Sequence, residues 1–235
     1  MKEIRRVPVT KEASKAWYDR ISKYYDLLGL FENRYKALAL EMADFREGEK
    51  VLEVGCGTGW ALERIARQVG ESGKAYGVDL SPKMLQVARE RLQKAGLMTR
   101  VELVEGDAAK MPFPDDMFGA AFSTFTLELF DTPDIAVVLS EVRRVLKPGG
   151  RFVDLSLSRE KVDIVTRAYE WIHDRFPQYF DCRPIYVERS LREAGFKIVS
   201  RRRIKILNLL CGEIVCGLKE KEKRASPQFG HHPFS

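Results

Sequence analysis

The sequence has 235 residues, of which 45% are hydrophobic and 31% are charged. These proportions exclude a disordered chain, a collagen-like chain and a disulfide scaffold, and they favour a soluble protein with a sizeable core. The 40 Lys and Arg residues exceed the 34 Asp and Glu residues by six. From Phe196 onward the chain has nine basic and three acidic residues, so this part accounts for the whole excess.

Length and composition predict a single domain with a short tail. At about 150 residues per domain, we expect one domain over residues 1–218, of which residues 1–46 form a helical lid segment, and a mobile tail over residues 219–235. The longest apolar stretch, Ile206 to Leu218, is interrupted by Asn208 and Glu213, whereas a membrane span needs about 20 mostly apolar residues. We therefore expect no membrane-spanning helix.

The N-terminal residues and the cysteines favour a cytoplasmic protein. No apolar segment follows the basic N-terminal residues, so no secretion signal is expected. The four cysteines have no C-x-x-C spacing, which favours free thiols in a reducing compartment and argues against a zinc site.

Two amphipathic helical segments are predicted before the first strand, over residues 14–28 and 31–45. The first carries Trp17, Tyr18, Ile21, Tyr24 and Tyr25 at helical spacing. Two interpretations stay open for these aromatic residues: they pack against the core, or they form a lid over a ligand, because rings with a polar tip suit the rim of a site.

From Val51 onward, short apolar runs alternate with helical segments, which predicts a doubly wound, mostly parallel sheet. Seven strands are expected, the last of them antiparallel, over residues 51–54, 75–79, 101–105, 118–123, 150–157, 196–203 and 206–218. The intervening helices are expected over residues 60–69, 82–95, 134–146, 161–175 and 187–194. Glycine or proline ends the first three of these helices.

The first strand leads into a glycine-rich loop, Val51-Leu-Glu-Val-Gly55-Cys-Gly57-Thr-Gly59-Trp60. Such glycines let the backbone approach a ligand, and the following helix N-terminus offers unpaired N–H groups. The dinucleotide-binding pattern G-x-G-x-x-G would need glycine at position 60, where Trp60 stands. The pattern here is G-x-G-x-G instead.

Two acidic residues follow the next two strands. Asp79 ends the second strand, where a carboxylate is able to accept hydrogen bonds from both hydroxyls of a ribose at the switch point of the sheet. Asp107 follows the third strand within Glu105-Gly-Asp-Ala-Ala109. Each motif is weak alone, but their order along the chain predicts one ligand site.

Together these motifs resemble the class I S-adenosylmethionine-dependent methyltransferases over about residues 18–218. The resemblance implies a Rossmann-like fold, S-adenosyl-L-methionine as cofactor, S-adenosyl-L-homocysteine as product and no metal. It implies that Glu53 faces the amino group, Asp79 the ribose and Asp107 the adenine. The remaining implied cofactor-binding residues are Tyr18, Gly55, Cys56, Gly57, Thr58, Gly59, Leu80, Met84, Gly106, Ala108 and Ser123.

A narrower resemblance is to the ubiquinone and menaquinone biosynthesis methyltransferase-like branch. It rests on the Tyr18-Asp19 and Tyr25-Asp26 pairs, the segments 107–115 and 141–150, and Leu191-Arg-Glu-Ala-Gly-Phe196. It implies a small-molecule or lipid-like acceptor, of the quinol type or a phospholipid headgroup. The segment 123–130 lacks the Asn-Val pair usual after the fourth strand in the quinone enzymes.

Methyl transfer from a sulfonium is an in-line displacement in which positioning and exclusion of water matter most. Three residues are candidates for catalysis. His173 is a candidate base, because a histidine ordinarily titrates near neutral pH, and its alternative is a surface histidine. Glu128 follows the fourth strand, and its alternative is a solvated helix residue. Tyr25, like Tyr18, is a candidate aromatic wall for the cationic sulfonium.

The sequence also bears on other acceptors and partners. The basic C-terminal part favours contact with an anionic membrane surface. The sequence lacks an Asn/Asp-Pro-Pro-Tyr motif after the fourth strand and any Pro-Cys dipeptide, which argues against nucleic acid. RNA or protein methylation and a non-catalytic cofactor sensor remain as alternatives, and the oligomeric state is not predicted.

Overall fold

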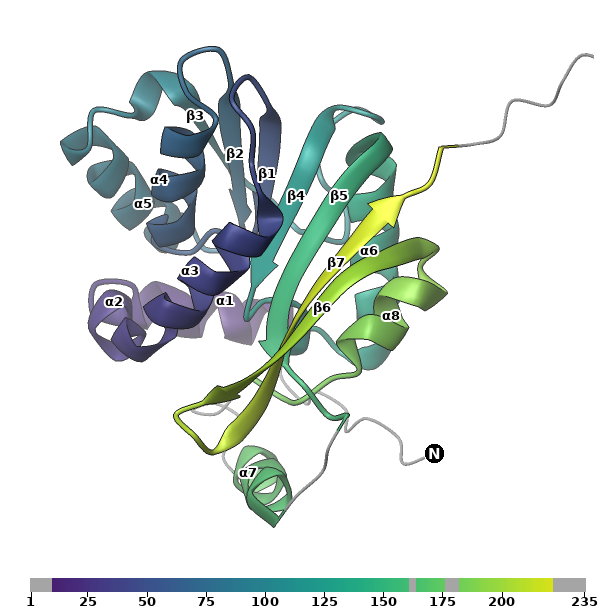
Figure 1. The fold of residues 1–235 in the computed structure, drawn as a ribbon. Helices are drawn as coiled ribbons and strands as arrows, with labels where there is room; N and C mark the ends of the chain where they lie inside the picture. Colours follow the sequence, from purple (N-terminus) through teal and green to yellow (C-terminus); the bar gives the residue numbers. More distant parts are fainter. Residues whose placement is uncertain (1–9, 161–163, 176–181, 222–235) are drawn as a thin grey trace, which may run out of the picture.

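The computed structural model describes residues 10–160, 164–175 and 182–221. Its described part contains one seven-stranded sheet with the order β3-β2-β1-β4-β5-β7-β6 (Figure 1). Neighbouring strands run parallel except at β7, which is antiparallel to both β5 and β6. The strands are β1 (Lys50–Val54), β2 (Lys74–Asp79), β3 (Val101–Glu105), β4 (Phe118–Thr124), β5 (Leu146–Leu157), β6 (Phe196–Ile206) and β7 (Leu210–Lys219).

Helices cover both faces of this sheet (Figure 1). Side chains alternate along β1, so that Val51 packs with α3, α4 and α5, whereas Leu52 packs with α6 and α8. The helices are α3 (Asn33–Ala43), α4 (Trp60–Gln68), α5 (Pro82–Lys94), α6 (Thr132–Val145) and α8 (Val187–Glu193). The prediction of a doubly wound sheet with an antiparallel last strand is confirmed.

The N-terminal segment is broken where one helix was predicted over residues 14–28. It forms α1 (Lys11–Ile21) and α2 (Tyr25–Leu28), followed by a 3-10 turn η1 (Leu30–Glu32). The Ser22 hydroxyl donates to the Asp19 carbonyl at 3.1 Å, which marks the end of α1. The first nine residues of the predicted lid segment lie outside the described residues.

Two acidic residues anchor this segment to the core. The Asp19 carboxylate accepts hydrogen bonds from the Ser81 hydroxyl at 2.6 Å and from the Lys83 backbone at 3.3 Å. The Asp26 carboxylate accepts from the Thr58 hydroxyl at 2.5 Å and pairs with Arg91. The segment is therefore fixed to the glycine-rich loop and to α5.

The last strand and the helix predicted over residues 161–175 differ in part from their predicted bounds. Lys219, predicted to begin the tail, belongs to β7, because it pairs with Phe196 of β6. Its ammonium also donates to Asp116 and to the Leu146 carbonyl, each at 2.7 Å. Residues 222–235 of the tail lie outside the described residues. The predicted helix over residues 161–175 is seen as α7 (Ile164–Arg175). No helix in the described ranges is long and apolar enough to cross a membrane.

Candidate functional site

The glycine-rich loop between β1 and α4 needs its glycines for two reasons. Gly55, Gly57 and Gly59 all have positive φ, a conformation that side chains with a Cβ rarely adopt. A Cβ on Gly55 would also lie 2.4 Å from the Thr126 side chain, so this approach is too close for any other residue. A Cβ on Gly57 would meet nothing within 4 Å, because this position faces an open cavity.

Two backbone N–H groups hold the Asp79 carboxylate in place. Its Oδ2 accepts from the Gly57 N–H at 2.8 Å, and its Oδ1 accepts from the Ser81 N–H at 2.9 Å. Burial raises the pKa of Asp79, and these two N–H groups oppose the rise because they favour the carboxylate. The carboxylate is thus positioned with free lone pairs for a further donor.

Glu53 is a buried carboxyl on β1 that lines the same cavity. Burial raises its pKa to about 8, the nearby Lys36 opposes the rise, and Asp79 adds to it. Its Oε2 has no hydrogen-bond partner among the described residues. An unpaired buried acceptor of this kind is suited to a cationic donor from a ligand.

Asp107 follows β3 at the opposite end of the cavity. Its Oδ1 accepts from the Ala109 N–H at 2.9 Å, and its Oδ2 pairs with the Lys11 ammonium at 2.7 Å. Burial is the largest single effect and raises the pKa of Asp107, but the Lys11 hydrogen bond, the Ala109 N–H and the Lys11 charge together outweigh it, so the pKa is lowered. Lys15, one turn later on α1, pairs with Glu105 at 2.7 Å.

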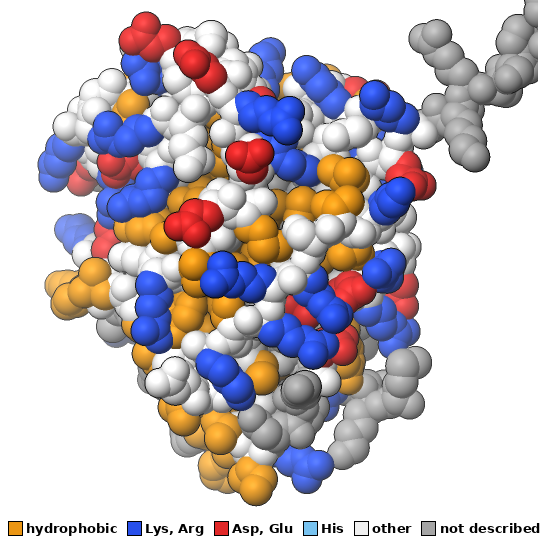
Figure 2. All heavy atoms as spheres, viewed as in Figure 1, with side chains coloured by type: hydrophobic (Ala, Val, Ile, Leu, Met, Phe, Trp, Pro, Cys, Tyr) orange, Lys and Arg blue, Asp and Glu red, His pale blue; other side chains and the backbone are white. Residues whose placement is uncertain are grey.

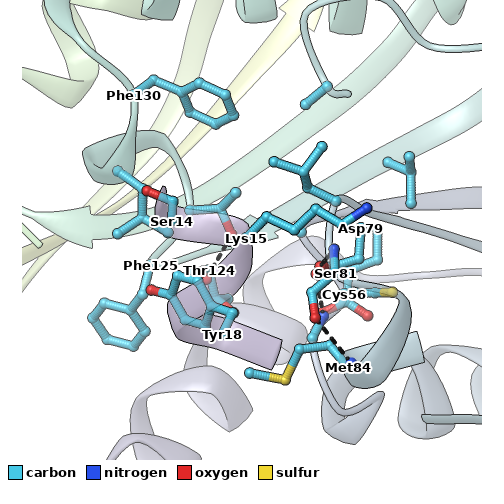
Figure 3. A pocket seen from close by; sticks show the side chains of 18 of the residues that line it. Ser14, Lys15, Tyr18, Cys56, Asp79, Ser81, Met84, Thr124, Phe125 and Phe130 are labelled. Carbon is cyan, nitrogen blue, oxygen red and sulfur yellow. Dashed lines mark hydrogen bonds between the residues drawn. The ribbon is translucent and has the colours of Figure 1, made fainter. Parts of the chain in front are cut away.

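These groups surround one cavity of about 170 Å³ at the carboxyl ends of β1, β2 and β4. Figure 3 shows α1 beside this cavity, and its residues Ser14, Lys15 and Tyr18 line it. Most of the predicted site residues line it, namely Tyr18, Tyr25, Glu53, Gly55, Cys56, Gly57, Thr58, Asp79, Leu80, Met84, Gly106, Asp107 and Ala108. The structure therefore brings them together, and their roles stay predictions.

Four predicted residues do not line this cavity. Gly59 lies under the loop, where a Cβ would contact Ala88 at 3.0 Å. Ser123 is buried on β4. Glu128 and His173 are also buried, so both alternatives, a solvated helix residue and a surface histidine, are wrong. His173 lies on the inward face of α7 with Thr166 and Glu170.

Glu128 lies in a 3-10 turn, η3 (Leu127–Leu129), directly after β4. Its Oε2 accepts from the Leu157 N–H at the end of β5. Burial raises the pKa of Glu128 to about 8, and that N–H opposes the rise. Thr126 and Leu129, close to it in the sequence, line the cavity, but Glu128 itself does not.

Sequence reasoning missed a large part of the lining. Lys11, Ser14, Lys15 and Tyr18 occur at the spacing i, i+3, i+4 and i+7, which places them on one face of α1. That spacing is a signal that could have found the first three. The other lining residues that were not predicted are Lys36, Trp60, Ala61, Val78, Ser81, Thr124, Phe125, Thr126, Leu129, Phe130, Asp131 and Asp134.

The described ranges contain no group of three or more His, Cys, Asp or Glu residues that could hold a metal ion. None of the four cysteines, all within the described ranges, forms a disulfide. The lining of the site offers hydrogen-bonding groups and apolar walls to a ligand.

The sequence matches known methyltransferases. Residues 51–150 match a family described as a methyltransferase domain. The ubiquinone/menaquinone biosynthesis C-methyltransferase of Hahella chejuensis (strain KCTC 2396) is 34% identical over 173 residues, which are 71% of this chain and 69% of that protein. The same-named protein of Pseudomonas putida (strain GB-1) is 33% identical over 70% of this chain. Only 66% of its own length is covered, just under two thirds.

Two solved structures are similar in fold. The crystal structure of the cyclase SpnF aligns with a TM-score of 0.75 and 20% identity over 94% of this chain and 100% of that chain. The structure of a SAM-dependent methyltransferase from Aquifex aeolicus aligns with a TM-score of 0.65 and 25% identity over 86% of this chain and 98% of that chain.

Proposed function

The chain belongs to the class I S-adenosylmethionine-dependent methyltransferases, and we propose that it methylates a ring carbon of a quinol-type small molecule. The observation that carries the proposal is one cavity that joins Glu53, the glycine-rich loop, Asp79 and Asp107 to an aromatic wall. The relatives named as quinone-biosynthesis C-methyltransferases support this acceptor class.

The residues present fit S-adenosylmethionine. The buried Glu53 Oε2 offers an acceptor to the ammonium group of the cofactor, and the open space at Gly57 admits its chain. Asp79, fixed by two backbone N–H groups, would accept the ribose hydroxyls. Asp107 and Ala108 would face the adenine, with Leu80 and Met84 as its apolar neighbours.

The acceptor would bind against the aromatic side of the cavity. Tyr18 and Tyr25 lie with their ring centroids 6.0 Å apart, and Phe125, Leu129 and Phe130 extend the apolar wall. Apolar and aromatic walls with few polar groups suit a planar ring. The same two tyrosines would lie near the cationic sulfonium, which the faces of aromatic rings attract.

The cofactor supplies the activated methyl group, and the chain orients the two reactants and excludes water. In the transfer, a bond would form between the ring carbon and the methyl group while the S–C bond breaks. The electron pair of the S–C bond would stay on the sulfur. The acceptor hydroxyl gives up a proton so that the ring carbon becomes nucleophilic, and the methylated carbon loses its hydrogen as a second proton when the ring regains aromaticity. The hydroxyl then takes a proton back from the surrounding groups or solvent, so one proton is released per turnover.

Glu128 is our candidate for the base that accepts the first of these protons, the one from the acceptor hydroxyl. It follows β4 between the cavity-lining residues Thr126 and Leu129, and its pKa of about 8 is near the working pH of a general base. His173 is the second candidate, from the inward face of α7. Because the acceptor is lipophilic, we also propose a cytoplasmic enzyme in peripheral contact with an anionic membrane.

The test uses cofactor carrying an isotope-labelled methyl group, the purified full chain and two acceptors. One is a short-chain prenylated hydroquinone with an unsubstituted ring position, and the other is phosphatidylethanolamine. Mass spectrometry should find the label on a ring carbon of the hydroquinone and not on the amine. Label on the phospholipid headgroup, or on neither acceptor, would overturn the proposed acceptor class. The Asp79→Ala variant, whose cofactor binding should be weakened, serves as the control, and its labelling should fall accordingly.

A further inference from the structure

Helix α7 exposes an unusual set of side chains. Its inward face carries polar residues, and Thr166, Glu170 and His173 are buried there. Its outward face carries Ile164, which is 84% exposed, and Trp171, which is 63% exposed. In a helix that packs on a protein core, the apolar residues normally face inward. The outward apolar face of α7 is therefore suited to a second apolar environment.

Two further elements expose apolar side chains, the α2–η1 segment and the tip of the β6–β7 hairpin. In the α2–η1 segment, Leu27 is 70% exposed and Leu30 is 59% exposed, with Tyr24 and Phe31 beside them in sequence. At the tip of the β6–β7 hairpin, Leu207 and Leu209 are each about half exposed. Figure 2 shows hydrophobic side chains reaching the surface at the lower end of the molecule, where Figure 1 places α7 and this tip.

Contacts link α3 and α7 to the β6–β7 hairpin. The Tyr35 hydroxyl on α3, which directly follows η1, donates to the Lys205 carbonyl at 2.9 Å and accepts from the Leu207 N–H at 2.8 Å. Helix α7 contacts β7 of the same hairpin, and its Tyr169 packs against the hydrophobic core, as do Ile204 and Leu210. We call the exposed apolar residues of α2–η1, the hairpin tip and α7 the apolar rim.

The exposed charged side chains that the structure describes around the apolar rim are basic. In residues 20–34, 164–175 and 205–209, every exposed charged side chain that the structure describes is basic: Arg20, Lys23, Arg34, Arg167, Arg175 and Lys205. The acidic residues described there, Asp26, Glu32 and Glu170, are at least partly buried. Exposed Leu, Phe and Trp side chains ringed by Lys and Arg are typical of a surface that lies in the headgroup region of an anionic bilayer.

We propose that the apolar rim docks the chain on an anionic phospholipid membrane. A second copy of the chain is a poorer occupant, because a two-fold contact through this surface would oppose basic side chains to basic side chains. The inference rests on the proposed function in one respect: α2 places Tyr25 in the cavity wall next to the exposed Tyr24. A ring would then enter the cavity while its tail stays in the bilayer.

The test is sedimentation of the full chain with lipid vesicles. The protein should bind vesicles that contain phosphatidylglycerol more tightly than vesicles of phosphatidylcholine alone, and salt should weaken this binding. The triple variant Leu27→Ser, Leu30→Ser and Trp171→Ser should bind at least about tenfold more weakly. The three apolar side chains whose burial in the bilayer would favour binding are then absent. The matched control is Val137→Ser, which removes an equally apolar but separate side chain on α6 that is 47% exposed.

A second variant tests the charges. Lys23→Gln with Lys205→Gln should weaken binding to the anionic vesicles on the order of tenfold and leave the salt dependence shallower. The control is Lys94→Gln with Lys147→Gln, outside the apolar rim. Equal binding to both kinds of vesicle, or an equal loss in the control variants, would overturn the proposal. So would a dimer in sedimentation velocity that the triple variant dissociates.

The outcome is separable from the proposed function. The surface variants should keep the melting temperature, cofactor affinity and methylation of a water-soluble hydroquinone, since none of these residues lines the cavity. If hydroquinones are methylated but vesicles are not bound, the docking surface falls and the acceptor class stands. If vesicles are bound as expected but no hydroquinone is methylated, the acceptor class falls instead.

Discussion

Cofactor binding is expected to release a proton from Glu53. Burial raises the pKa of this carboxyl to about 8, so the side chain is mostly neutral at pH 7. With that pKa, about 0.9 of the molecules carry the proton at pH 7. The ammonium group of S-adenosylmethionine, placed against Oε2, would favour the carboxylate, because a nearby opposite charge lowers the pKa of an acid. Full ionisation would release about 0.9 proton per cofactor.

Calorimetry measures this proton directly. Titrations at pH 7 in buffers of different ionisation enthalpy give the number of protons released from the slope of observed heat against buffer enthalpy. Below pH 7 the amino group of the cofactor is still protonated, since α-amino groups titrate near 7.7–8.0. In that range the affinity should rise by up to about tenfold per pH unit, because the site must lose its proton to bind.

Two variants decide whether Glu53 is the source. Glu53→Gln has no proton to lose, so the release and the pH dependence of affinity should both disappear. Asp107→Asn is the matched control: the pKa of Asp107 is lowered and its carboxyl is already ionised at pH 7, so the variant should bind more weakly but release the same proton. Unchanged proton release in Glu53→Gln would refute the reasoning.

Four further outcomes are expected. Asp79→Ala should weaken cofactor binding by about 2 kcal/mol or more by calorimetry, since hydrogen bonds to a charged group are lost, and unchanged affinity would contradict the ribose role. Lys11→Ala should tighten binding by no more than about fivefold, because it frees Asp107 from an exposed ion pair worth under about 1 kcal/mol; weaker binding would speak against this competition. Burial raises the pKa of Asp154 to about 7. The stability that the protonated side chain contributes is therefore complete below the ordinary pKa of an aspartate and is lost as pH rises through about 7. Asp154→Asn should flatten this fall in melting temperature. Glu128→Gln should lower kcat on the order of a hundredfold and remove the acidic limb of its pH profile with cofactor affinity unchanged; a lower melting temperature with normal kcat would make Glu128 structural.

The sheet could be predicted closely because buried parallel strands give strong local signals. The run of residues 51–54 was predicted to be a strand and lies in β1 (Lys50–Val54), where all four of these residues are buried, and Asp79 ends β2 as expected. A parallel strand covered on both faces reads as a short apolar run between glycines, so neighbouring residues alone identify it. The glycine-rich loop is likewise a local feature of the chain.

The polar interior could not be predicted in this way. Glu128 and His173 were equally compatible with an exposed helix surface, and only the packing of distant segments buries them. The Lys11–Asp107 pair joins residues 96 positions apart, so neither sequence neighbourhood contains a signal for it. Residues 14–28 show one amphipathic pattern, but contacts of Asp19 and Asp26 with the core divide the segment into α1 and α2.

These contacts give the N-terminal segment two functions at once. Through Asp26 it is tied to Thr58 in the glycine-rich loop, and through Tyr25 it closes the aromatic side of the cavity. The opposite side of the same short helix presents Leu27 to the outside. Under our proposals, an acceptor arriving from the bilayer reaches the cavity past α2, whereas the cofactor lies beyond it against Asp79. Membrane docking and closure of the cavity would then depend on one four-residue helix.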